Sequence, residues 1–106
     1  MSEMERELEV VLLQRYELWK GIGYSARRFK RMLTPSDVTY KGPVGTVRHL
    51  LRKRPGARSG FERLRAAGKL EWTVEALFEH DRQWHRLFTD AEIEAARRRF
   101  RAARPG

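Results

Sequence analysis

The sequence contains no cysteine, so a disulfide framework, a thiolate nucleophile and a cysteine-rich zinc site are all excluded. It also lacks a long apolar run, since no stretch approaches the ~20 residues that a membrane-spanning helix requires. Residues 1–7 are acidic, whereas the start of a signal peptide is basic. These absences lead us to expect a cytoplasmic protein that has no contact with a membrane.

Strand signals are equally scarce. The segment 38–40 (Val-Thr-Tyr) is the one alternating stretch, and it is too short to build a sheet. We therefore predict an all-α fold. With 106 residues, of which 41% are hydrophobic, the chain has enough apolar surface for one core. We predict a single helical domain over 1–106, a compact bundle of about six short helices, with a frayed tail over 102–106.

Apolar spacing and helix punctuation predict where the six helices lie. The first is an acidic N-terminal helix within 1–20, ended by glycines, and the second covers 25–33. Pro43 opens the third, and Pro55-Gly56 stops it. The fourth lies between Ser59 and Gly68, the fifth begins at Thr73, and the last begins at Thr89.

Several helix ends carry capping signals. Ser25 is the predicted N-cap of the second helix, and Gly68 occupies a position typical of a left-handed C-cap. The spacing Ser59 to Glu62, and again Thr89 to Glu92, matches a capping box. We expect a polar bend over 80–83. The three tryptophans adjoin apolar stripes, so we predict that they pack in the core and do not stack on bases: Trp19, Trp72 and Trp84.

Acidic residues are rare in the middle of the chain. The formal net charge is +9, and residues 21–69 hold thirteen basic and two acidic side chains, a net charge of +11. Residues 1–20 have a net charge of −2, and residues 70–106 are neutral overall. A concentrated positive segment attracts polyanions through counterion release and electrostatic steering.

The basic residues of the middle segment form two clusters, and guanidinium groups suit phosphate oxygens because they donate bidentately. We predict that these clusters bind nucleic acid without catalysis: Arg27, Arg28, Lys30, Arg31, Arg48, Arg52, Lys53, Arg54 and Arg58. A third cluster lies in the last helix: Arg97, Arg98, Arg99 and Arg101. Short helices joined by tight turns also leave a helix-turn-helix arrangement open.

Other interpretations compete with nucleic-acid binding. The positive segment also suits an acidic protein partner, which would make the chain a protein-protein interaction adaptor. Docking of the acidic start of the first helix on the basic middle of a second copy would give a homodimer. An arginine-rich composition that reflects GC-rich coding, with a solvated face and no ligand, is a further alternative.

Signals for catalysis are absent from the pattern. His80 and His85 are five residues apart, do not share a helix face, and have no third ligand at a recognisable spacing. The glycines at 21–23 and 42–45 lack the preceding strand and the Lys-Ser/Thr of a phosphate loop. We therefore predict no catalytic residues, no metal and no cofactor, and expect that the protein is not an enzyme.

A set of apolar, glycine and capping positions recurs from Glu17 to about Arg101. It comprises Leu18-Trp19, Ile22-Gly23-Tyr24, Arg28-Phe29, Met32-Leu33, the stretch 47–51, Gly60-Phe61, Leu64, Gly68-Lys69-Leu70, the stretch 73–77, Leu87-Phe88-Thr89, Glu92 and Ala95-Ala96-Arg97. In these positions the chain resembles a family of small bacterial helical domains of unknown function, which occur alone or appended to larger proteins. The chain departs from the family at 34–41, where relatives have a shorter turn. The resemblance implies the helical order and no catalytic residue.

Overall fold

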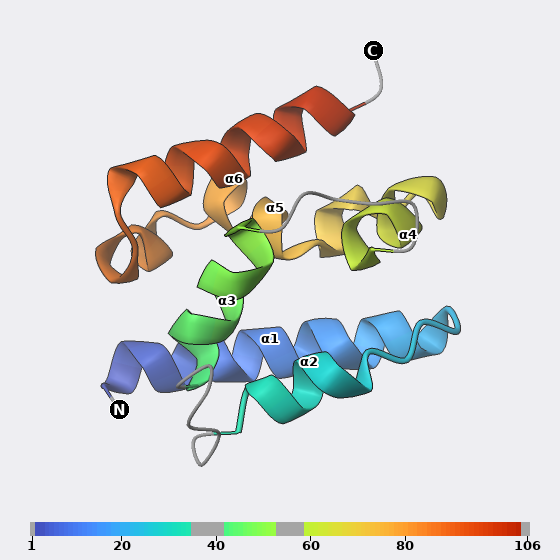
Figure 1. Ribbon diagram of the computed structural model, residues 1–106, viewed down its shortest axis with the longest axis horizontal. Helices are drawn as coiled ribbons and strands as arrows, with labels where there is room; N and C mark the ends of the chain where they lie inside the picture. Colours follow the sequence, from blue (N-terminus) through green and yellow to red (C-terminus); the bar gives the residue numbers. More distant parts are fainter. Residues whose placement is uncertain (1, 35–41, 53–58, 105–106) are drawn as a thin grey trace. The chain divides into compact units, whose positions relative to one another are not determined.

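The computed structural model describes residues 2–34, 42–52 and 59–104. The fold is all-α, as predicted: these residues form six α-helices and two short 3₁₀ helices, and no strand (Figure 1). The chain divides into two compact units, Met1–Lys53 and Arg54–Gly106, and each is described by itself. The single domain over 1–106 stays a prediction.

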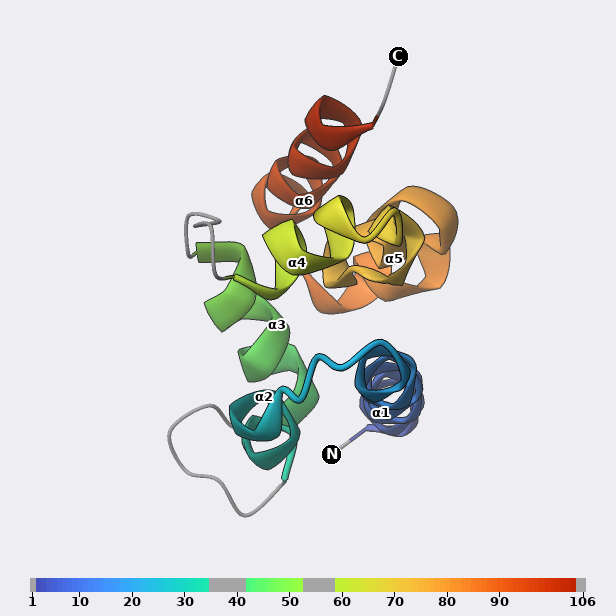
Figure 2. The same cartoon turned by 90° about the vertical axis from the view of Figure 1, so that its right-hand side faces the viewer.

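Unit 1 contains three helices that pack against one another: α1 (Glu3–Gly21), α2 (Arg27–Met32) and α3 (Gly42–Arg52). Figure 2 views α1 nearly end-on, with α2 and α3 beside it. The core face of α1 follows helical spacing, with one buried side chain per turn. Its buried residues are Leu8, Leu12, Tyr16 and Trp19.

A glycine turn ends α1 and directs the chain back toward it. Gly23 adopts a φ of 85°, which favours glycine because other residues have a Cβ that clashes in this region. The N–H of Tyr24 donates to the carbonyl of Trp19 at 2.9 Å, and that of Gly23 donates to the carbonyl of Lys20 at 3.0 Å. These two hydrogen bonds form the Schellman pattern. The rings of Trp19 and Tyr24 pack together, with centroids 5.5 Å apart.

The helix α2 packs on α1 through its apolar side. Phe29, Met32 and Leu33 are buried, and the Phe29 ring lies 4.7 Å from that of Trp19. The prediction of Ser25 as N-cap is wrong: the N-cap is Ala26, and no side chain caps the helix. The helix begins two residues later than predicted, so the side chain of Ser25 lies too far from its first N–H groups.

The helix α3 completes unit 1. Pro43 is its second residue, in the first turn, where a missing N–H costs no hydrogen bond. Pro43, Thr46, Val47 and Leu51 are buried, and the hydroxyl of Thr46 donates to the carbonyl of Gly42 at 2.8 Å. The predicted stop at Pro55-Gly56 lies outside the described residues.

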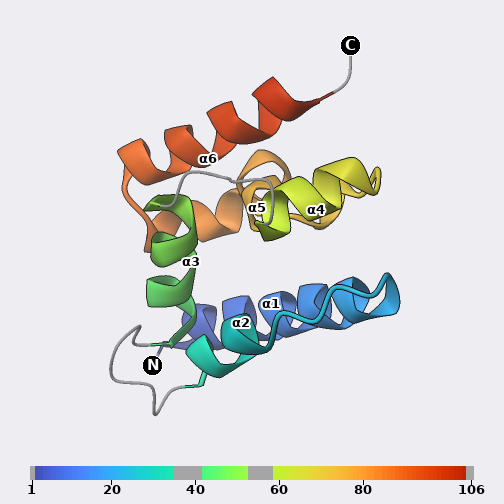
Figure 3. The ribbon, with the colours of Figure 1, turned by 45° about the vertical axis from the view of Figure 1, so that its right-hand side comes forward.

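Unit 2 contains α4 (Gly60–Ala66), the 3₁₀ helix η1 (Leu70–Trp72), α5 (Val74–His80), the 3₁₀ helix η2 (Arg82–Leu87) and α6 (Asp90–Ala103). The helix α6 packs along α5, which also contacts η1 and η2 (Figure 3). Every residue of α5 from 74 to 78 is buried. The other elements add buried apolar side chains: Leu64, Trp84, Phe88, Ile93, Ala96 and Phe100.

The predicted caps of α5 and α6 are confirmed. The hydroxyl of Thr73 accepts from the N–H of Ala76 at 3.2 Å and begins α5. Thr89 and Glu92 form a complete capping box: the Glu92 N–H donates to the Thr89 hydroxyl at 3.1 Å, and the Thr89 N–H donates to the Glu92 carboxylate at 2.8 Å. These bonds satisfy the N–H groups that a helix start leaves without intrahelical partners.

The ends of α4 agree only in part with the prediction. Ser59 accepts from the N–H of Glu62 at 3.2 Å, but the carboxylate of Glu62 accepts from Arg65 at 2.7 and 2.9 Å instead of completing a capping box. Gly68 has the predicted left-handed conformation, with a φ of 73°. The N–H of Lys69 donates to the carbonyl of Leu64 at 2.8 Å, which closes a second Schellman turn.

The 3₁₀ helices were not predicted from the sequence. The bend expected over 80–83 is instead the end of α5 followed directly by η2, and η1 fills the gap between α4 and α5. η1 has three residues and η2 has six, and the apolar spacing of such short helices is too brief to distinguish from that of a loop. The helix α6 continues through Ala103, into the segment predicted to fray, and residues 105–106 lie outside the described residues.

Candidate nucleic-acid interface

The helix α2 presents four basic side chains to solvent. Arg27, Lys30 and Arg31 follow the spacing i, i+3, i+4 and therefore share one side of the helix, opposite the buried apolar residues. Arg28 flanks them and is also exposed. We call these four residues the α2 basic face. That these residues bind nucleic acid stays a prediction.

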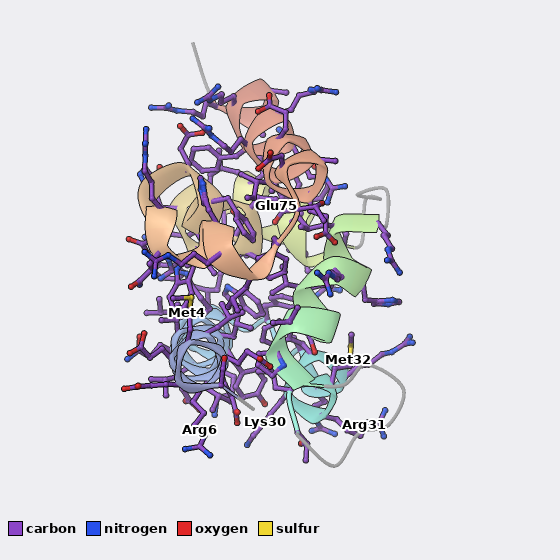
Figure 4. The ribbon with its side chains drawn as sticks, turned by 90° about the vertical axis from the view of Figure 1, so that its left-hand side faces the viewer. Met4, Arg6, Lys30, Arg31, Met32 and Glu75 are labelled. Atoms are coloured by element: carbon purple, nitrogen blue, oxygen red, sulfur yellow. The ribbon has the colours of Figure 1, made fainter. Side chains whose placement is uncertain are left out.

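The aromatic residues of α1 support the α2 basic face. The Nζ of Lys30 lies 5.5 Å from the centroid of the Tyr16 ring, and the Nζ of Lys20 lies 5.1 Å from the same centroid. Both distances fall in the range of cation–π attraction. Tyr16 is buried, so its ring is a fixed support for two ammonium groups from different helices. Figure 4 shows Arg6 of α1 and both Lys30 and Arg31 along the same edge of unit 1 in that view.

Neither α2 nor α3 contains an acidic residue, so neither helix carries a carboxylate that could oppose this charge. Within the described ranges, no ion pair involves Arg27, Lys30 or Arg31. Glu17, at the end of α1, pairs with Lys20 at 3.0 Å. The α2 basic face therefore concentrates four like charges within five consecutive residues, and an anionic ligand would relieve the repulsion.

The second predicted cluster is described only in part. Arg48 is half-buried and Arg52 exposed, one helical turn apart on α3, and α3 packs on α2. Six of the nine predicted residues thus belong to two adjoining helices of unit 1. The remaining three, Lys53, Arg54 and Arg58, lie outside the described residues.

The third cluster is divided among several sides of α6, and two of its arginines pair with carboxylates of α5. The Nη1 of Arg99 donates to the Oε2 of Glu75 at 2.8 Å, and Arg101 donates to both carboxylate oxygens of Glu79 at 3.0 and 3.1 Å. Two of its four guanidinium groups therefore hold α6 against α5. Consecutive residues of a helix point about 100° apart, so a run of arginines is divided among several sides.

Glu75 is the buried charged residue that sequence analysis did not identify as a tertiary contact. It lies between α5 and α6 (Figure 4), and 4% of it is exposed. Burial raises the pKa of its carboxyl, whereas the hydrogen bond from Arg99 lowers it. In the sequence, Glu75 is a glutamate in the first turn of a helix, where the helix dipole alone favours a carboxylate. Its partner is 24 positions away, and no local pattern links the two.

The α2–α3 pair does not match a helix-turn-helix. Nine residues separate the end of α2 from the start of α3, whereas that motif joins its helices by a turn of about three or four residues. The α2 basic face is also shorter than two turns. This pair therefore does not provide the recognition helix of a helix-turn-helix motif.

The histidines occupy separate environments. The Nε2 of His80 lies 2.6 Å from the Oε2 of Glu71, and the Nε2 of His85 lies 3.4 Å from the carbonyl oxygen of Phe78. Among the residues whose positions are described, no three His, Asp or Glu side chains gather as metal ligands.

Comparison with protein-family models, with curated proteins and with solved structures finds no match. The resemblance to a bacterial helical family therefore stays a prediction. None of the described helices is both long enough and apolar enough to cross a membrane.

Proposed function

We propose that the protein is a non-catalytic nucleic-acid-binding module that contacts phosphates through the α2 basic face, with Arg48 and Arg52 of α3 as further contacts. The observation that carries this proposal is the concentration of four exposed cations on α2, with no acidic residue on α2 or α3. Phosphate contacts supply most of the affinity of sequence-independent nucleic-acid binding.

The predicted mode is backbone contact with little base preference. Guanidinium and ammonium groups bind phosphate oxygens on any sequence, whereas base reading requires side chains that enter a groove. The two tryptophans that are buried, Trp19 and Trp84, are packed in the core as predicted, so they do not stack on bases. Trp72 is partly exposed, and the Nζ of Lys69 lies 4.8 Å from its ring centroid.

The test is binding of the full chain to duplex and single-stranded oligonucleotides as the salt concentration rises. The double variant Arg27→Gln/Arg31→Gln removes two cations and leaves Phe29 in place. For duplex DNA, each lost phosphate contact should reduce the slope of log affinity against log salt by ~0.9, so we expect a reduction of ~2.

The matched control is Arg82→Gln/Arg86→Gln, which removes the same charge from two exposed residues of η2 in unit 2, again four positions apart. This control should leave the slope unchanged. The proposal is wrong if binding is undetectable at low salt, or if the control weakens binding as much as the α2 variant does.

A protein-interaction role is the second candidate, and the exposed apolar residues of α1 favour it. Val10 is 54% exposed, Ile22 40% and Leu18 37%. Side chains of this kind contribute apolar contacts to interfaces, including those between identical copies. Sedimentation equilibrium together with the salt titration separates the two candidates: association without oligonucleotide binding would favour the adaptor or the homodimer.

A further inference from the structure

Three arginines of α6 lie on one side of the helix toward its C-terminal end. Arg97, Arg101 and Arg104 follow the spacing i, i+4, i+7, which places side chains above one another on successive turns. Arg97 and Arg101 belong to α6, and Arg104 is its C-cap residue. This alignment was not predicted from the sequence, because the third cluster joins neighbouring arginines and does not include Arg104.

One carboxylate of α5, that of Glu79, contacts Arg101 and is affected by the charges of the other two arginines. Arg101 holds Glu79 by two hydrogen bonds, at 3.0 and 3.1 Å, and Arg97 and Arg104 also lower the pKa of Glu79 by charge. Glu94, exposed on α6, also acts on Arg101 by its charge. Three guanidinium charges therefore exceed two carboxylate charges. Net positive charge remains at the site, although Glu79 is itself satisfied.

Other side chains of unit 2 hold two of these guanidinium groups in position. The carboxylate of Glu79 fixes Arg101 through its Nε and Nη2. The guanidinium carbon of Arg104 lies 5.7 Å from the centroid of the buried Phe100 ring, and the His80 ring meets the same ring edge-on at 5.8 Å. The Nε of Arg97 is buried and has no hydrogen-bond partner in the described part of the chain. The arginines are thus held near one another, and Arg101 and Arg104 are exposed to a ligand.

We propose that Arg97, Arg101 and Arg104 form a phosphoryl-binding site on unit 2. A phosphoryl group has three oxygens that accept hydrogen bonds and up to two negative charges, which suits several guanidinium forks better than a single carboxylate does. Glu79 holds Arg101 in place by two hydrogen bonds. The site lies on different residues from the α2 basic face, so it goes beyond the proposed function.

The experiment is a titration of the full chain with inorganic phosphate at constant ionic strength, followed by ¹⁵N NMR shifts of α6 amides, with acetate in a parallel titration. We expect saturable shifts with phosphate that acetate does not reproduce. Arg104→Gln should weaken phosphate binding by about tenfold or more, as expected for loss of one charge-assisted contact. The matched control Arg98→Gln removes the charge of an exposed neighbour on another side of α6 and should change affinity less than about twofold.

Circular dichroism of each variant establishes that α6 is still folded. The inference is overturned if acetate shifts the same amides equally, or if Arg98→Gln weakens binding as much as Arg104→Gln. The double variant Arg27→Gln/Arg31→Gln should bind phosphate at α6 normally, so failure of the proposed function does not affect this result. Competition by a single-stranded oligonucleotide would identify the phosphoryl group as a backbone phosphate, and its absence would indicate a small phosphorylated ligand.

Discussion

Removing Arg99 from its ion pair with Glu75 should lower the free energy of unfolding, because the carboxylate that remains is almost fully buried. Glu75 is almost fully buried, with 6% of its side chain exposed, whereas 20% of the Arg99 side chain is exposed. The substitution Arg99→Gln leaves a carboxylate buried without its cation. Removing one partner of a buried pair costs about 3–5 kcal/mol, and the partial exposure of Arg99 favours the lower end, about 3 kcal/mol at pH 7.

This loss should depend on pH in a defined direction. Burial raises the pKa of the Glu75 carboxyl in the folded protein above its ordinary value of 4.5. The contribution of Glu75 to the free energy of unfolding is therefore complete below pH 4.5 and declines as pH rises through the folded pKa. Arg99→Gln removes the hydrogen bond that lowers this pKa, so the decline becomes larger. The difference between wild type and variant should therefore grow with pH. Below the ordinary pKa, Glu75 is protonated in both proteins, and we expect a loss of less than about 1 kcal/mol.

Urea unfolding followed by far-ultraviolet circular dichroism at pH 4 and pH 7 measures both quantities. Arg98→Gln, on the same helix but exposed, should change the free energy of unfolding by less than about 0.5 kcal/mol at either pH. A loss for Arg99→Gln that is equal at the two pH values, or larger at pH 4, would refute the reasoning about the buried carboxylate.

Two helix ends provide further predictions, both measured by thermal or urea unfolding. Gly68→Ala should cost about 1 kcal/mol, because a φ of 73° is unfavourable for a residue with a Cβ even though no atom lies within 4 Å of it. Gly21→Ala, in the last turn of α1 without that conformation, should instead stabilise by up to about 1 kcal/mol, and a loss at both glycines would contradict the conformational explanation. Thr89→Ala should cost about 1 kcal/mol through loss of the capping box, whereas Thr89→Ser should cost much less; equal losses would argue against the hydroxyl as the cause.

The all-α class and the order of the six α-helices could be predicted from the sequence because helical spacing and caps are local signals. Buried side chains such as Leu8, Leu12 and Trp19 recur at the predicted interval, and the hydroxyl caps of Thr73 and Thr89 act within three residues. The exception at Ser25 is also local. A serine near a helix start is an N-cap only when the helix begins beside it, and the chain turns two residues later.

The exposure of the α2 basic face was likewise contained in the sequence, since four cations within five positions cannot all avoid solvent on so short a helix. The tertiary structure alone decided which other arginines have carboxylate partners. Glu75 contacts Arg99, and Glu79 contacts Arg101, only because α6 packs along α5. The residues of each pair are more than twenty positions apart in the sequence. The physical reason is that charge is a property of a residue, whereas its neutralisation depends on what packing brings within a few ångströms of it.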